Sequence, residues 1–150
     1  MSLQKQVMEE MKVAMKAKDT LTLESLRAIK SSLLLLQTDK GAAEEGISEE
    51  DEIKLVQKLV KQRKDSAAIY TEQGREDLAA PELAQAAVIE KFLPEQLSAE
   101  EIEKVVLATI AKTGADGMKD MGKVMGMVSK ELAGQADGKT ISKSVRQHLS

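Results

Sequence analysis

Apolar residues recur along the chain at intervals of three and four positions, which is the spacing of one face of an α-helix. The first two such segments cover residues 3–17 and 20–37. The inner face expected of the first segment consists of Leu3, Val7, Met11 and Met15. The inner face expected of the second consists of Leu23, Leu26, Ile29 and Leu33. Asp19 is the predicted N-cap of the second helix, because its carboxylate can accept from a free backbone N–H of the first turn.

Two more helices are expected before residue 95. Residues 38–47 contain two glycines, Gly41 and Gly46, and are predicted to form a loop. Ser48 then caps a long helix that ends at Gly74, a residue suited to the left-handed conformation after a helix. In the fourth helix we expect Pro81 in the first turn, where a missing N–H costs nothing, and Pro94 as the stop.

Three shorter helices are predicted after this proline, over residues 98–112, 118–132 and 139–149. Ser98 and Glu101 have the spacing of a capping box, and Leu97 and Ile102 add a hydrophobic staple. No stretch shows the alternating pattern of a β-strand. The predicted fold is therefore all-α. It comprises an N-terminal four-helix domain, residues 1–95, followed by a small three-helix C-terminal bundle, residues 96–150.

The composition excludes several kinds of chemistry. The chain has no cysteine and a single histidine, His148, so a disulfide framework, a thiolate zinc site and a histidine metal cluster are excluded. Aromatic residues make up 1%, which leaves almost no platform on which a nucleic-acid base could stack. The N-terminus lacks the long apolar stretch of a signal peptide, and no segment is long enough to cross a membrane. We expect a cytoplasmic protein that does not bind membranes.

One segment partly matches a phosphate-binding loop. Residues 117–123 fit the first seven positions of that motif, but Val124 stands where a Ser or Thr must bind magnesium. A strand should precede the motif, and here a helix and a turn do. His148 likewise has no recognisable nucleophile or orienting carboxylate beside it in sequence. The sequence therefore predicts no catalytic residue, metal site or cofactor.

Residues 118–132 carry the most informative pattern. Projected as a helix, the segment has an apolar face, with Lys119 and Lys123 opposite and Gly122 and Gly126 at the border. A glycine inside a helix costs about 1 kcal/mol relative to alanine. Two glycines one turn apart therefore suggest that something approaches closely. The pattern favours a neighbouring helix, and the alternative is the backbone of a nucleic acid.

The last predicted helix repeats this arrangement, with Lys139, Lys143 and Arg146 opposite its apolar face. From Lys104 onward the chain has eight basic and four acidic residues, although its overall net charge is −3. A lysine stripe opposite an apolar face is most often a solvated surface, and two such stripes in one small bundle raise the odds of an anionic partner a little. A further charged run, residues 62–66, is interpreted as a solvated helix face, with a partner-docking surface as the alternative.

The chain resembles the YqeY family. The segments that carry the resemblance, in order and spacing, are residues 61–67, 74–78, 92–98, 118–126 and 136–139. The resemblance implies kinship with the helical and tail regions of the B subunit of glutamine-dependent tRNA amidotransferases, in which the tail is similar to a tRNA-recognition module. Two positions depart from the family: Gln135 stands where an arginine is common, and Pro81 interrupts a helical segment.

Three functions follow from the residues and the resemblance together. The first is a stand-alone, non-catalytic tRNA-binding accessory module that works with an aminoacyl-tRNA synthetase or an amidotransferase. The second is a helical protein–protein adaptor that uses the acidic N-terminal domain. The third is a component of a carbon–nitrogen ligase with glutamine as amido donor. The RNA-binding residues predicted for the first are Lys119, Gly122, Lys123, Gly126, Lys139, Lys143 and Arg146.

Overall fold

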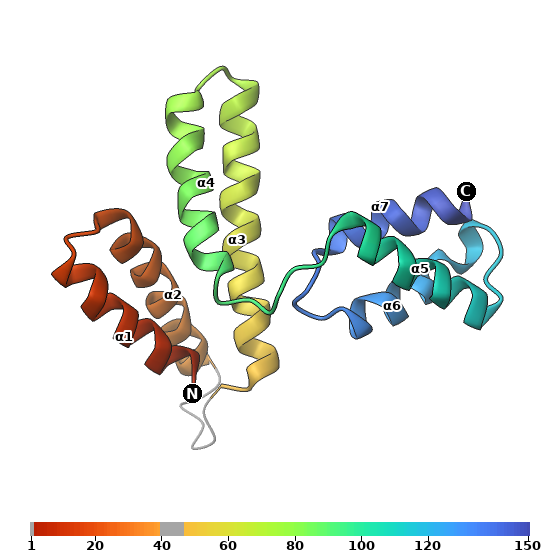
Figure 1. Ribbon diagram of the computed structural model, residues 1–150, viewed down its shortest axis with the longest axis horizontal. Helices are drawn as coiled ribbons and strands as arrows, with labels where there is room; N and C mark the ends of the chain where they lie inside the picture. The colour runs from red at the N-terminus through yellow and green to blue at the C-terminus, as the bar shows by residue number, and fades with distance from the viewer. Residues whose placement is uncertain (1, 40–46) are drawn as a thin grey trace. The chain divides into compact units, whose positions relative to one another are not determined.

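The computed structural model describes residues 2–39 and 47–150 (Figure 1). These residues form seven α-helices and one short 3₁₀-helix, and they contain no strand, so the all-α prediction is confirmed. The chain divides into two compact units, Met1–Leu93 and Pro94–Ser150. Most of the loop predicted over residues 38–47 lies outside the described residues.

The first two helices, α1 (Leu3–Lys16) and α2 (Thr20–Asp39), are joined by a short turn. Asp19 caps α2 as predicted, with its Oδ1 accepting from the Thr22 N–H at 3.1 Å. The assignment of Met15 to the inner face was wrong, because its side chain is 54% exposed and Ala14 is buried instead. A helix turns once every 3.6 residues, so positions spaced by four drift off the buried face after three steps.

The next two helices, α3 (Glu49–Glu72) and α4 (Glu76–Glu90), pack side by side as a hairpin (Figure 1). Ser48 caps α3 by accepting from the Asp51 N–H at 3.2 Å. Gly74 stands in the connection with φ of 72°, a conformation that most other residues avoid. The predicted end of α3 at this glycine is confirmed.

The sequence prediction was wrong about how Pro81 and Pro94 relate to the ends of α4. The helix begins at Glu76, so Pro81 lies inside it and not in its first turn. Pro81 cannot donate to the carbonyl one turn earlier, but the remaining turns of the helix continue through it. At the other end α4 stops at Glu90, before Pro94, and the chain turns so that Phe92 packs against the core.

The core of the first unit is made of aliphatic residues from all four of its helices. Its buried members are Leu3, Val7, Ala14, Leu26, Ile29, Leu33, Val56, Leu59, Val60, Ala86 and Ile89. The Leu3 N–H donates to the Glu52 carboxylate at 2.9 Å and ties the start of α1 to α3. The apolar stripe of each helix thus explains the packing, as expected for amphipathic helices.

The charged run at residues 62–66 is only partly a solvated face. Arg63 is half-buried, and its guanidinium donates to the Gln85 side chain at 3.1 Å and to the Leu59 carbonyl at 3.2 Å. Lys64 lies 3.6 Å from the Glu90 carboxylate. This run therefore helps to join α3 to α4, a role that neither interpretation of the sequence had assigned to it.

The second unit contains α5 (Ala99–Thr113), η1 (Met118–Asp120), α6 (Met121–Glu131) and α7 (Gly138–Leu149). The capping box of α5 is present in full, because Ser98 and Glu101 exchange bonds of 3.2 and 3.0 Å. The segment predicted as one helix from residue 118 begins as the 3₁₀ turn η1. Each of α5, α6 and α7 packs against the other two. Their buried core residues are Ile102, Val106, Val124, Val128, Leu132, Ala136, Ile141, Val145 and Leu149.

Candidate functional site

The outer face of η1 and α6 carries four of the predicted site residues. Val124 and Val128 are fully buried and fix the orientation of α6. Because successive residues turn by about 100°, residues on the opposite side of the helix from these valines point away from the core, whereas Met125 packs against it. Lys119, Lys123, Gly122 and Gly126 are all exposed.

The two glycines of α6 face open space. A Cβ atom added to Gly122 or to Gly126 would meet no heavy atom within 4 Å among the described residues. The neighbouring helix that the sequence pattern favoured is therefore not what requires these glycines. The surface of α6 at Gly122 and Gly126, called here the glycine strip, stays accessible to a molecule outside this chain.

The outer face of α7 carries the other three predicted residues. Asp137 caps the helix by accepting from the Thr140 N–H at 2.6 Å, and Ile141 and Val145 anchor its inner face. Lys139, Lys143 and Arg146 lie on the opposite side and are exposed.

These three cations share one surface depression with the start of α5. Its volume is about 760 Å³. The residues that line it are Ala99, Ile102, Glu103, Lys139, Thr140, Ser142, Lys143, Ser144, Arg146 and Gln147. The structure thus brings Lys139, Lys143 and Arg146 together. The residues of η1 and α6 do not line this depression and form a separate part of the candidate site.

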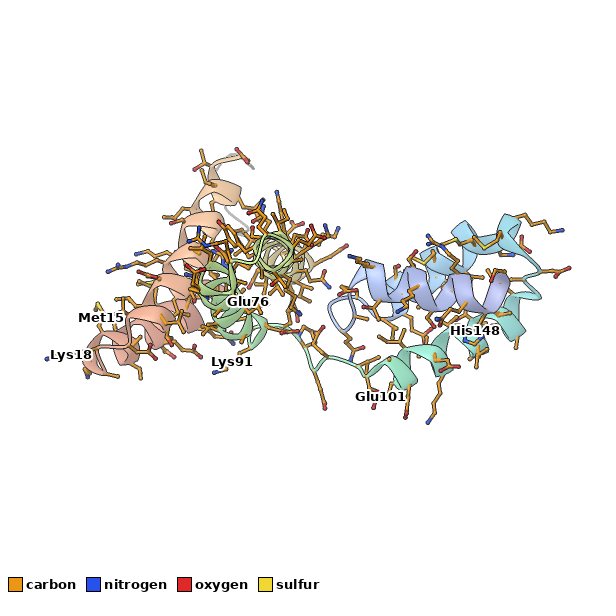
Figure 2. The ribbon with its side chains drawn as sticks, turned by 90° about the horizontal axis from the view of Figure 1, so that it is seen from above. Met15, Lys18, Glu76, Lys91, Glu101 and His148 are labelled. Atoms are coloured by element: carbon orange, nitrogen blue, oxygen red, sulfur yellow. The ribbon has the colours of Figure 1, made fainter. Side chains whose placement is uncertain are left out.

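A contact between α5 and α7 borders the depression. The His148 Nε2 atom lies 3.3 Å from the Glu103 Oε1 atom, with the side chains 26% and 49% exposed respectively. Figure 2 shows His148 near the end of α7 and Glu101 in the first turn of α5, two residues before Glu103. The single histidine of the chain is therefore a half-buried helix-joining residue.

The five site cations are Lys119, Lys123, Lys139, Lys143 and Arg146. None of them forms an ion pair or a side-chain hydrogen bond within residues 2–39 and 47–150. The described residues also contain no group of three acidic, histidine or cysteine side chains that could hold a metal ion. Unpaired cations, the partly exposed hydroxyl residues of the depression and a backbone strip without side chains are groups that contact phosphate oxygens. These groups can bind an anion.

Sequence reasoning missed the contribution of α5 to the site. Glu103, Ala99 and Ile102 line the depression only because α5 and α7 pack together, and no local spacing connects them to Lys143. A signal for the cations was nevertheless available. Lys139 and Lys143 are one helical turn apart and have no acid four positions away, an arrangement of like charges that destabilises a helix slightly.

No helix in the described part of the chain is long and apolar enough to span a bilayer.

Comparisons with known proteins agree with one another. Residues 4–149 match the family model described as "Yqey-like protein". A similar protein is "Altered inheritance of mitochondria protein 41, mitochondrial" from Meyerozyma guilliermondii, which is 33% identical over 132 residues. The match covers 84% of this chain and 66% of that protein, slightly less than two thirds of its length.

Proposed function

Because the chain belongs to the YqeY family, we propose that it is a non-catalytic accessory module whose second unit, Pro94–Ser150, binds tRNA. In this proposal the module works beside an aminoacyl-tRNA synthetase or an amidotransferase, which would carry out the chemistry. The resemblance of the second unit to the tail of the amidotransferase B subunit supports this choice of partner.

The observation that carries the proposal is the state of the basic side chains in the second unit. Lys119, Lys123, Lys139, Lys143 and Arg146 are exposed and have no acidic partner among the described residues. Like-charged residues one turn apart reduce helix stability, and a polyanion offsets that cost. The open glycine strip on α6 adds a place where a phosphate backbone can come close to the helix.

The mode of binding follows from the residues that the second unit lacks. The two aromatic residues of the chain, Tyr70 and Phe92, both precede it. Recognition of unstacked bases uses aromatic side chains, whereas recognition of an RNA double helix uses its shape, its phosphates and its 2′-hydroxyl groups. We therefore expect contacts with the backbone of a folded tRNA that depend little on base sequence.

A titration of the full chain with tRNA at several salt concentrations tests the proposal. If three to five cations meet phosphates, the slope of log K against log salt is expected to lie between about −2 and −4. An absence of binding at low salt contradicts the proposal. Binding with a slope near zero contradicts the assignment of the five cations.

A second candidate function, a protein adaptor, is favoured by a groove between α2 and α3. Its volume is about 400 Å³ and its lining includes Leu35, Leu36, Leu55 and Leu59. Leu35 is 67% exposed, which is unusual for a leucine within a cluster of leucines. A partner protein that stays bound after nuclease treatment, and is lost on Leu35→Ser, would favour this function.

A further inference from the structure

The depression between α5 and α7 contains one acid among its cations. Glu103 is the single carboxylate in the set of described residues that line it, and Lys139, Lys143 and Arg146 are its three cations. A carboxylate repels the phosphates that such cations attract. Beyond its contact with His148, an acid at this place favours ligand binding if the ligand also offers a hydrogen-bond donor.

The contact with His148 leaves most of this carboxylate available. His148 approaches the Oε1 atom of Glu103 at 3.3 Å, and no other contact with the carboxylate is found among the described residues. An ionised carboxylate can accept about four hydrogen bonds. Since 49% of the Glu103 side chain is exposed, it can accept a donor from a ligand in the depression.

The donor that lies beside phosphates in a nucleic acid is the ribose 2′-hydroxyl. In an RNA double helix the wide, shallow groove displays these hydroxyl groups next to the backbone. The amino groups of bases are the other donors, but a protein that holds unstacked bases uses aromatic side chains, and residues 94–150 contain no Phe, Tyr or Trp. A ligand positioned by its phosphates therefore presents a ribose to Glu103.

We propose that Glu103 is a specificity-determining residue that accepts a hydrogen bond from a ribose 2′-hydroxyl while Lys139, Lys143 and Arg146 contact the neighbouring phosphates. This inference rests on the proposed RNA-binding function. DNA lacks the hydroxyl group, so it leaves the Glu103 carboxylate without a donor and close to phosphates. The depression thus selects RNA over DNA of the same sequence.

The test compares three hairpins of one sequence, made of RNA, of 2′-O-methyl RNA and of DNA, each titrated with the full chain. The 2′-O-methyl hairpin removes the donor and keeps the geometry of an RNA helix. Wild-type protein is expected to bind the RNA hairpin roughly three- to tenfold more tightly than the methylated one, the effect of one ordinary hydrogen bond, because the Glu103 carboxylate is half exposed to water. Glu103→Ala is expected to reduce this ratio to about one.

A matched control is Glu100→Ala, which removes the same charge from an exposed position of α5 outside the depression. This variant is expected to keep the wild-type ratio. If circular dichroism shows that Glu103→Ala is unfolded, Glu103→Gln replaces it. Glutamine removes the charge and keeps an acceptor, so the DNA hairpin is expected to bind more tightly to this variant, and unchanged DNA affinity contradicts the proposal.

The outcomes separate this inference from the function on which it rests. A wild-type ratio near one, with measurable RNA binding, overturns the role of Glu103 and leaves the RNA-binding function intact. A ratio that persists in Glu103→Ala also overturns that role. Failure of all three hairpins to bind at low salt contradicts the RNA-binding function itself, and the role of Glu103 with it.

Discussion

The α3–α4 hairpin and the second unit use the same charged residue types in opposite ways. On the hairpin, basic side chains pair with acids of the chain itself. The pairs are Lys54 with Glu50 at 3.1 Å, Lys61 with Asp65 at 3.1 Å, Lys64 with Glu90 at 3.6 Å and Arg75 with Asp77 at 3.0 Å. Within the described residues, the second unit has a single pair, between His148 and Glu103, and no Lys or Arg takes part in it.

Between α3 and α7 the difference follows from the positions of acids along the helix. Glu50 and Asp65 each stand four residues from a lysine, a spacing that brings opposite charges together on a helix. On α7 the residue four positions after Lys139 is another lysine. The hairpin pairs four of its basic side chains with its own acids, and hydrogen bonds from Arg75 hold the pKa of Asp77 below its ordinary value. The second unit keeps its positive charges available for another molecule.

The largest effect is expected from removing the available charges. One variant replaces the five site cations, Lys119, Lys123, Lys139, Lys143 and Arg146, by alanine. It is expected to weaken tRNA binding at least about 100-fold at low salt. Each phosphate contact that is lost leaves a counterion on the RNA, so binding no longer gains free energy from its release. Equilibrium titration measures this change. Circular dichroism and thermal unfolding verify that the variant is folded.

A matched variant removes the same number of exposed lysines from the first unit. It replaces Lys5, Lys12, Lys16, Lys58 and Lys91 by alanine. Both variants are titrated at the same salt concentrations, and at about 0.15 M, where charges beyond about 8 Å are screened, this one is expected to change tRNA affinity less than threefold. Equal losses in the two variants would mean that net charge, and not the placement of cations in the second unit, governs binding.

The glycine strip gives the next largest effect. Gly126→Leu is expected to weaken tRNA binding about tenfold, because a leucine would hold the phosphate backbone away from α6. The helix itself has room for the new side chain, since a Cβ atom at this position meets nothing within 4 Å. Circular dichroism should therefore show a folded protein. If the variant unfolds, Gly126 is needed for helix packing, and the prediction about RNA binding is contradicted.

Local signals were sufficient to predict most helices from sequence. The start of α5 at Ser98 and the end of α3 at Gly74 depend on neighbours within a few positions, so capping rules located both. Pro81 was misplaced because proline was assumed to mark a helix start. In the structure the turn at Gly74 sets the start of α4, and packing of α4 against α2 and α3 offsets the missing hydrogen bond of the proline.

The candidate site was predictable where it follows one helix and not where it joins two. The face opposite Ile141 and Val145 follows from helix periodicity, which identified Lys139 and Lys143 as outward-facing. Whether another helix covers the glycine strip at Gly126 depends on tertiary packing. The sequence pattern favoured a neighbouring helix, but none lies within 4 Å of the position of a Cβ atom there among the described residues. The approach of α7 to α5 that brings Glu103 into the depression has no local signal.

A smaller effect is expected at the cap that begins the second unit. Ser98→Ala removes the acceptor for the Glu101 N–H and is expected to cost about 1 kcal/mol of unfolding free energy. Chemical denaturation of the full chain, followed by circular dichroism, measures the change. The cations of α6 and α7 keep their places in the folded state, so tRNA affinity should stay within about twofold of wild type at temperatures where the variant is folded. A large loss of affinity without a loss of stability would show that the start of α5 takes part in binding directly.

The smallest effect is expected on the hairpin, where charges are already paired. Lys61→Ala breaks the pair with Asp65, and both side chains are more than half exposed. Pairs of this kind contribute about 0.3–0.5 kcal/mol on a helix surface. The unfolding free energy should therefore fall by no more than about 0.5 kcal/mol, and tRNA affinity should not change measurably. Asp65→Ala serves as the matched control, because it breaks the same pair and leaves the lysine unpaired. If Asp65→Ala creates a new salt-dependent contribution to tRNA binding, an unpaired lysine is enough to recruit RNA on either unit, and the contrast between the two regions depends on pairing alone.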